Sequence, residues 1–71
     1  MPLAFVRKGS RVQIVRVDAG QGLRARLTAM GLIPETVIDV LMNSSKGPLV
    51  ISLKGSRIIL GHVIAQKIMV A

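Results

Sequence analysis

The stretch LRARLTAMGLIPETVIDV, residues 23–40, places a helix, a stop signal and a strand next to one another. Leu23, Leu27 and Met30 are spaced i, i+4 and i+7, so they share one face of a helix. The start of this helix is weakly marked, and Asp18 is the only nearby side chain that could cap it. The stretch therefore predicts one amphipathic helix that buries a single face.

The end of the helix is marked three times. Gly31 can adopt the left-handed conformation that follows a helix, and Leu32 can then fold back onto Leu27. Pro34 prevents the helix from continuing. The sequence thus predicts a sharp reversal from helix to strand.

The two arginines of the stretch are not equivalent. At about 100° per residue, Arg24 points away from the leucine face, whereas Arg26 lies at its edge. We expect Arg26 to lay its stem on the core and to hold backbone carbonyls or a carboxylate, with Asp39 as one candidate. Arg24 is expected to be a free surface charge.

The rest of the chain consists of short aliphatic runs separated by Gly, Ser, Asn and Pro, which is typical of a small β-barrel or sandwich. The run 11–17 shifts phase after Ile14, as a bulge would require. In the run 36–42, Ile38, Val40 and Met42 are expected to share one face. Five strands are predicted: 11–17, 36–42, 48–53, 57–60 and 67–71.

Size and composition favour one small domain over residues 1–71 with a thin aliphatic core. There is no Cys, and Phe5 is the only aromatic residue. The longest strongly apolar run, residues 58–65, is far shorter than the roughly 20 residues that a membrane span needs. We expect a cytoplasmic protein without a membrane span.

The charge balance predicts an anionic partner. Ten Lys and Arg against three acidic residues give a net charge of +7. Apolar residues also exceed what a small barrel can bury, so some are expected on the outside, where an apolar patch with a basic rim would suit docking to a protein. The candidates are Val15, Val17, Val37, Val50, Ile59 and Met69.

The sequence offers no chemistry for catalysis. One His, no Cys and three scattered acids cannot form a catalytic triad or a ligand set for Zn or Fe, so neither an enzyme nor a metal or cofactor site is expected. His62 is interpreted as a partly buried residue or as the start of a helix.

Several motifs, taken in order, resemble the ferrous iron transport A (FeoA) family. They are PLAFVRKGSRVQIVRV at residues 2–17, RLTAMGLIPETVIDV at 26–40, GPLVISLKGSRIIL at 47–60 and the closing Ala65, Ile68 and Val70. The resemblance covers nearly the whole chain. One departure is that Glu35 follows Pro34 where the family usually has Gly, which predicts either a turn without positive φ or local strain.

This resemblance implies an SH3-like β-barrel of about five strands, with one helix after the first strand and a short helical turn before the last. It implies a small cytosolic accessory protein, peripheral to the inner membrane through its partner, a FeoB-type Fe(II) permease with a GTPase domain. A homo-oligomer is left open. Gly31, Leu32, Pro34 and Ala65 would be structural. The expected partner-binding residues are Arg24, Arg26, Leu27, Met30 and Lys46.

The alternative is an RNA- or ribosome-associated SH3-like module of the KOW type. The run RKGSRVQIVRVDAGQG at residues 7–22 loosely follows its pattern of basic residue, Gly, strand and Gly, and the +7 charge suits phosphate. Binders of single-stranded nucleic acid stack bases on aromatic rings, however, and this chain has only Phe5. Nucleic acid is therefore the less favoured partner.

Overall fold

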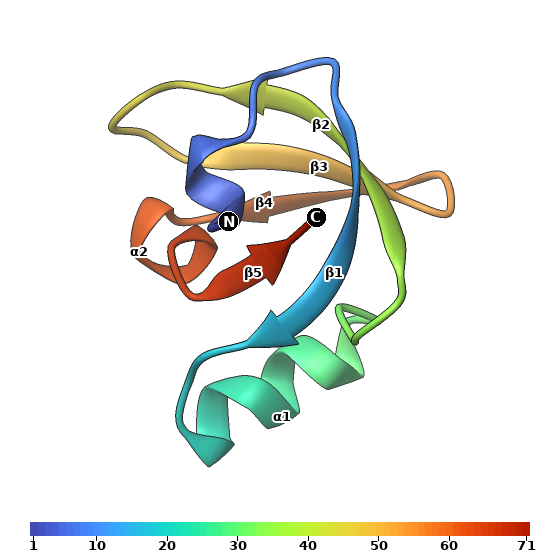
Figure 1. Ribbon diagram of the computed structural model, residues 1–71, viewed down its shortest axis with the longest axis vertical. Helices are drawn as coiled ribbons and strands as arrows, with labels where there is room; N and C mark the ends of the chain where they lie inside the picture. The colour runs from blue at the N-terminus through green and yellow to red at the C-terminus, as the bar shows by residue number, and fades with distance from the viewer.

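Five antiparallel strands form one sheet in this computed structural model, which describes residues 1–71 (Figure 1). The strand order is β4-β3-β2-β1-β5. Because β4 and β5 do not pair with each other, the sheet curves around the core without closing. Every predicted strand is present, with ends shifted by at most one residue: β1 Arg11–Val17, β2 Val37–Asn43, β3 Leu49–Leu53, β4 Ser56–Leu60 and β5 Ile68–Val70.

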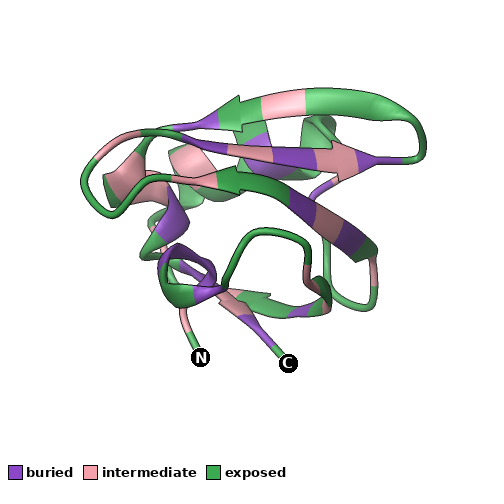
Figure 2. Ribbon diagram, turned by 90° about the horizontal axis from the view of Figure 1, so that it is seen from above, coloured by how far each residue is buried: buried purple, intermediate pink, exposed green.

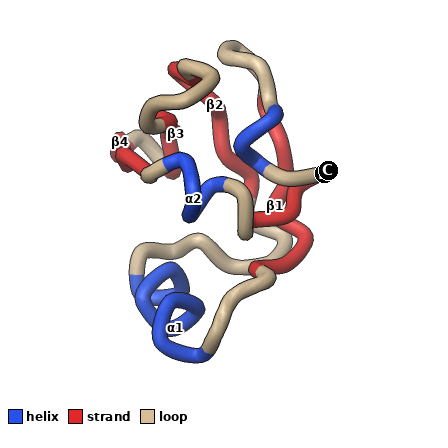
Figure 3. Tube along the Cα trace, turned by 90° about the vertical axis from the view of Figure 1, so that its left-hand side faces the viewer, coloured by secondary structure: helices blue, strands red, loops and turns tan.

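Three short helical segments join or precede the strands. The predicted helix α1 (Gln21–Ala29) follows β1, and the predicted helical turn before the last strand is α2 (His62–Ala65). A 3-10 turn, η1 (Leu3–Phe5), packs against α2 and was not predicted. Seen from the side, α1 lies below the sheet, whereas α2 lies beside the strands (Figure 3).

Two bulges bend the sheet. The β1–β5 pairing shifts between Ile14 and Arg16, which confirms the predicted change of phase. A second shift, in the β2–β3 pairing between Val40 and Met42, was missed. The extra residue there, Leu41, turns Met42 outward, so Met42 is 57% exposed. The prediction that Met42 shares the buried face of Val40 is therefore wrong.

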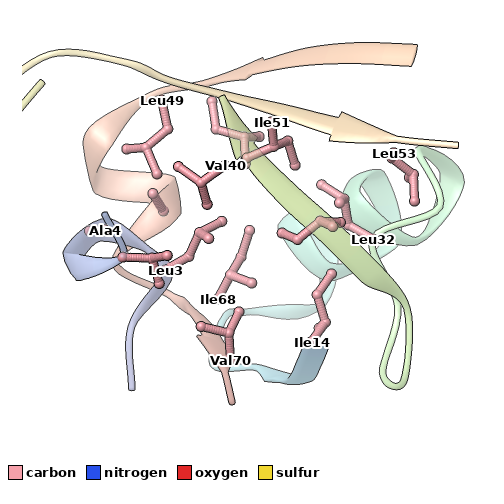
Figure 4. Close-up of a cluster of buried hydrophobic side chains, with 14 of the residues drawn as sticks. Leu3, Ala4, Ile14, Leu32, Val40, Leu49, Ile51, Leu53, Ile68 and Val70 are labelled. Carbon is pink, nitrogen blue, oxygen red and sulfur yellow. The ribbon is translucent and has the colours of Figure 1, made fainter. Parts of the chain in front are cut away.

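The core is entirely aliphatic. Its side chains point inward from all five strands, η1 and the end of α1 (Figure 4). Along β3 buried and half-buried residues alternate, as a strand covered on one face requires (Figure 2). The fifteen buried residues are Leu3, Ala4, Val6, Ile14, Leu27, Leu32, Ile38, Val40, Leu49, Ile51, Leu53, Leu60, Ala65, Ile68 and Val70.

The end of α1 has the predicted geometry. Gly31 has φ +89°, the Leu32 amide donates to the Leu27 carbonyl at 2.9 Å, and the Gly31 amide donates to the Thr28 carbonyl at 2.9 Å. These two bonds form a Schellman motif and satisfy carbonyls that the helix leaves free. Leu27 and Leu32 are both buried in the core, so the turn fixes α1 to the sheet.

The start of α1 and its apolar face differ from the prediction. The residue before the helix, Gly20, provides no side-chain cap, and the Asp18 carboxylate instead accepts from Arg16 Nε at 2.8 Å. Met30, expected on the buried face, is 43% exposed because it is the C-cap residue that follows the helix and directly precedes the reversal.

The turn into β2 carries strain. Glu35 has φ +76°, which costs a residue with a side chain roughly 1–2 kcal/mol. The backbone is held there on both sides, because its amide donates to the Ile14 carbonyl at 2.7 Å and its carbonyl accepts from Gln13 Nε2 at 3.1 Å. Of the two predicted outcomes at this departure from the family pattern, the structure shows the strained one.

The turn at Gly31 that ends α1 predicts that Gly→Ala has opposite effects on the free energy of unfolding at Gly31 and Gly22. Gly31→Ala should lower the free energy of unfolding by more than about 1 kcal/mol, because φ is positive and a Cβ there would lie 3.1 Å from Leu53 Cδ2. Gly22→Ala, inside α1 with no atom within 4 Å of its Cβ, should raise it by about 0.5–1 kcal/mol. Urea denaturation checks both, and equal effects at the two sites would contradict the assigned turn.

Candidate docking surfaces

The predicted partner-binding residues do not form one surface. Arg24, Arg26 and Met30 are exposed on α1, and Lys46 is exposed in the loop between β2 and β3. Leu27 is only 2% exposed and belongs to the core, so its predicted role in docking is wrong. Helix α1 and the β2–β3 loop lie at opposite ends of the molecule (Figures 1 and 3).

Arg26 does not make the predicted ion pair. Its side chain is exposed and has no hydrogen-bond partner, while Asp39 accepts from Arg11 Nε at 2.9 Å across the β1–β2 pairing. The hydrogen bond to Asp39, with the attraction between the two charges, raises the pKa of Arg11. The stability that this raised pKa represents is lost as the pH rises through the pKa of Arg11, far above neutrality, so Arg11 adds no pH dependence to folding near neutral pH.

Most of the positive charge is free. The pairs Arg11–Asp39 and Arg16–Asp18 engage two of the ten Lys and Arg side chains, and Glu35 pairs with none. An exposed pair of this kind adds little stability. The cations without an ion pair are all exposed: Arg7, Lys8, Arg24, Arg26, Lys46, Lys54, Arg57 and Lys67.

The largest concavity lies near Lys46 but away from α1. We call it the N-terminal hollow; it has a volume of about 680 Å³ and lies where η1, the residues after η1, the end of β2 and the start of α2 meet. It combines apolar residues with two free cations and several polar side chains. Its lining is Ala4, Phe5, Val6, Arg7, Lys8, Asn43, Ser45 and His62.

Asn43, at the end of β2, holds two sides of this hollow together. Its Nδ2 donates to the Ala4 carbonyl at 2.9 Å and to the Val6 carbonyl at 2.7 Å, which ties the segment after η1 to the sheet. With both amide protons used, Asn43 Oδ1 is buried without a partner, as is His62 Nδ1. Buried polar atoms are seldom left unpaired in proteins, but both atoms are closed to solvent, so a ligand in the hollow does not reach them.

A second exposed surface covers the outer face of the sheet. Met42 pairs with Val50, and Val50 pairs with Ile59, so three apolar side chains form a row across β2, β3 and β4. Leu41 and Arg57 join Met42 and Val50 around a shallow groove of about 320 Å³. Of the apolar residues predicted outside, Val15, Val37 and Ile59 are exposed, and Val17, Val50 and Met69 are half-buried.

The structure shows no group of three or more His, Asp or Glu side chains that could hold a metal ion. His62 is half-buried and begins α2, as predicted. No helix is both long and apolar enough to cross a membrane.

Sequence reasoning missed the N-terminal hollow. Phe5, Arg7 and Lys8 stand close together in the sequence, and an exposed ring beside two cations was a usable signal. Nothing near Asn43 in the sequence indicates that it would bind carbonyls almost forty residues away. That contact becomes visible only once the position of η1 over the sheet is known.

The asparagine contact predicts a large effect from a nearly isosteric change. Asn43→Asp replaces a donor to two carbonyls with a carboxylate, so it should lower the free energy of unfolding by about 1–3 kcal/mol. It should also speed amide hydrogen exchange in residues 3–6. The matched control is Gln13→Glu, the same exchange of amide for acid at an exposed bond, with a cost within about 0.5 kcal/mol. Equal costs would refute the special role of Asn43.

Comparison with known proteins finds close relatives. The family model for the FeoA domain matches residues 1–71. A Methanocaldococcus jannaschii protein named as a candidate Fe(2+) transport protein A is 44% identical over 69 residues, which cover 97% of this chain and 83% of the relative.

Comparison with solved structures also finds FeoA proteins. The crystal structure of an iron uptake regulatory protein, FeoA, superposes with a TM-score of 0.92 at 34% identity, covering 99% of this chain and 93% of that one. FeoA of Stenotrophomonas maltophilia, described as a prokaryotic SH3 domain protein, superposes with a TM-score of 0.87 at 17% identity, covering 100% and 89%. This likeness in fold confirms the predicted SH3-like architecture. The chain belongs to the FeoA family.

Proposed function

We propose that this chain is a non-catalytic accessory protein of ferrous iron uptake. It docks on a FeoB-type Fe(II) permease from the cytoplasmic side of the inner membrane and modulates the GTPase-coupled transport. Membership of the FeoA family supports this role, as does the Fe(2+) transport name of the M. jannaschii relative. Iron is the cargo of the permease and does not need to bind this chain.

The observation that carries the proposal is the coexistence of free positive charge and exposed apolar side chains. Eight exposed cations have no ion pair, and large apolar residues such as Phe5, Met42 and Ile59 are more than half exposed. In protein complexes, charges of this kind speed and orient the encounter, and desolvated apolar anchors supply most of the affinity. An acidic face on the permease would complement this surface.

Nucleic acid is the competing partner. The free cations would suit phosphate, but they are spread over both ends of the molecule instead of forming one stripe. The only aromatic ring is Phe5, which leaves no platform for stacking successive bases. The geometry therefore favours docking to a protein.

The proposal predicts that reversing charge at both ends weakens permease binding. The double variant Arg24→Glu, Lys46→Glu should bind detergent-solubilised permease at least about tenfold more weakly, with slower association at low salt. Because the two residues lie at opposite ends, the single variants will assign the loss to α1 or to the β2–β3 loop. Surface-based binding kinetics at two salt concentrations provide the measurement.

The matched control is Lys54→Glu, Lys67→Glu, which changes the net charge by the same amount at other exposed positions. Its affinity should stay within about threefold of the wild type. If the Arg24, Lys46 variant binds as well as the wild type, the electrostatic part of the proposal is wrong. If both variants lose affinity equally, net charge and not a defined face determines binding.

A further inference from the structure

The N-terminal hollow is constructed differently from the other exposed surfaces. Its base is apolar, because Ala4 and Val6 are almost completely buried beneath it, while the Phe5 ring is 65% exposed at its side. Its volume of about 680 Å³ falls within the range of about 300–1,000 Å³ that is typical of ligand sites. It therefore has both the size and an apolar surface for a bound side chain.

Two polar atoms beside the hollow lack partners but are closed to a ligand. The orientation of the Asn43 amide is fixed by its two donated hydrogen bonds, so its Oδ1 is an acceptor without a donor. His62 Nδ1 is likewise unpaired. Because both atoms have almost no exposed surface, a ligand would be held by the apolar base and the cations of the hollow instead.

The positive charge of the hollow favours a ligand that carries negative charge. Arg7 and Lys8 stand at its edge without ion pairs, because Asp18 and Asp39 are engaged elsewhere. Lys46 is exposed in the loop that supplies Ser45 to the lining. The lining contains no acidic residue, so its charged residues are all positive, which is complementary to carboxylates.

From these features we infer that the N-terminal hollow binds an acidic peptide segment that contains an apolar residue. The apolar side chain packs against Phe5 and the base of the hollow, and acidic side chains pair with Arg7 and Lys8. The inference rests on the proposed function only in that a docking partner would supply the segment.

A synthetic peptide tests this site without the permease. The probe is the hexapeptide acetyl-EELDEL-amide, titrated into the full ¹⁵N-labelled chain and followed by NMR. Saturable shifts are expected at the amides of residues 5–8, Asn43 and His62, with α1 unchanged. Arg7→Glu, Lys8→Glu should weaken binding at least about tenfold. The charge-matched Arg24→Glu, Arg26→Glu variant, whose cations also lack ion pairs, should stay within about threefold of the wild type.

A neutral probe tests whether the charge of the peptide matters. The Gln-substituted peptide acetyl-QQLNQL-amide should bind more weakly than the acidic one. Equal binding of the two peptides would overturn the pairing of acidic side chains with Arg7 and Lys8.

Three other outcomes would overturn the inference. They are the absence of saturable shifts, shifts spread over all free cations, and shifts in the hollow caused by anionic phosphatidylglycerol vesicles but not by the peptide. The last would identify the hollow as a membrane contact. None of them would affect the permease binding experiment, so failure of this site is distinguishable from failure of the proposed function.

Discussion

The reversal at Gly31 is the constraint on which the rest of the fold depends. It brings Leu32 back over Leu27, and the two side chains join the core beside Leu53. Helix α1 makes few other contacts with the sheet, so this turn largely determines where the helix lies. The same turn starts the path into β2, where Glu35 must accept a left-handed backbone to continue the chain beside β1. A helix, a strand pairing and a strained residue thus follow from one short segment.

The aliphatic core explains why so much apolar surface remains outside. Without a Trp or Tyr, this domain fills its interior with aliphatic side chains, and fifteen buried residues, thirteen of them Leu, Ile or Val, form the core. The bulges at Ile14 and Leu41 curve the sheet around this small volume and, in doing so, turn neighbouring apolar residues outward. Met42, which the second bulge places beside Val50 on the outer face, is the clearest result. The exposed surface is therefore partly a geometric consequence of how the sheet bends, and it is available for docking.

The sequence predicted the parts of the molecule that local chemistry determines. Alternating aliphatic residues defined the five strands, and Gly31 with Pro34 defined the end of the helix. Features that depend on strand register were missed. Asp39 pairs with Arg11 because the β1–β2 pairing places them opposite each other, and residue types alone could not choose Arg11 over Arg26. The N-terminal hollow was missed because its lining comes from three separate parts of the chain, which only the folded structure brings together.

The most direct test of the account is to identify what the protein binds in its own cells. A tagged copy would be purified from detergent-solubilised cells with and without nuclease, and the co-eluting proteins identified by mass spectrometry. Docking on the iron permease predicts a membrane protein with a GTPase domain that co-elutes in both preparations. Recovery of ribosomal proteins or RNA that disappear after nuclease treatment would contradict it, and would show that the positive charge serves nucleic acid.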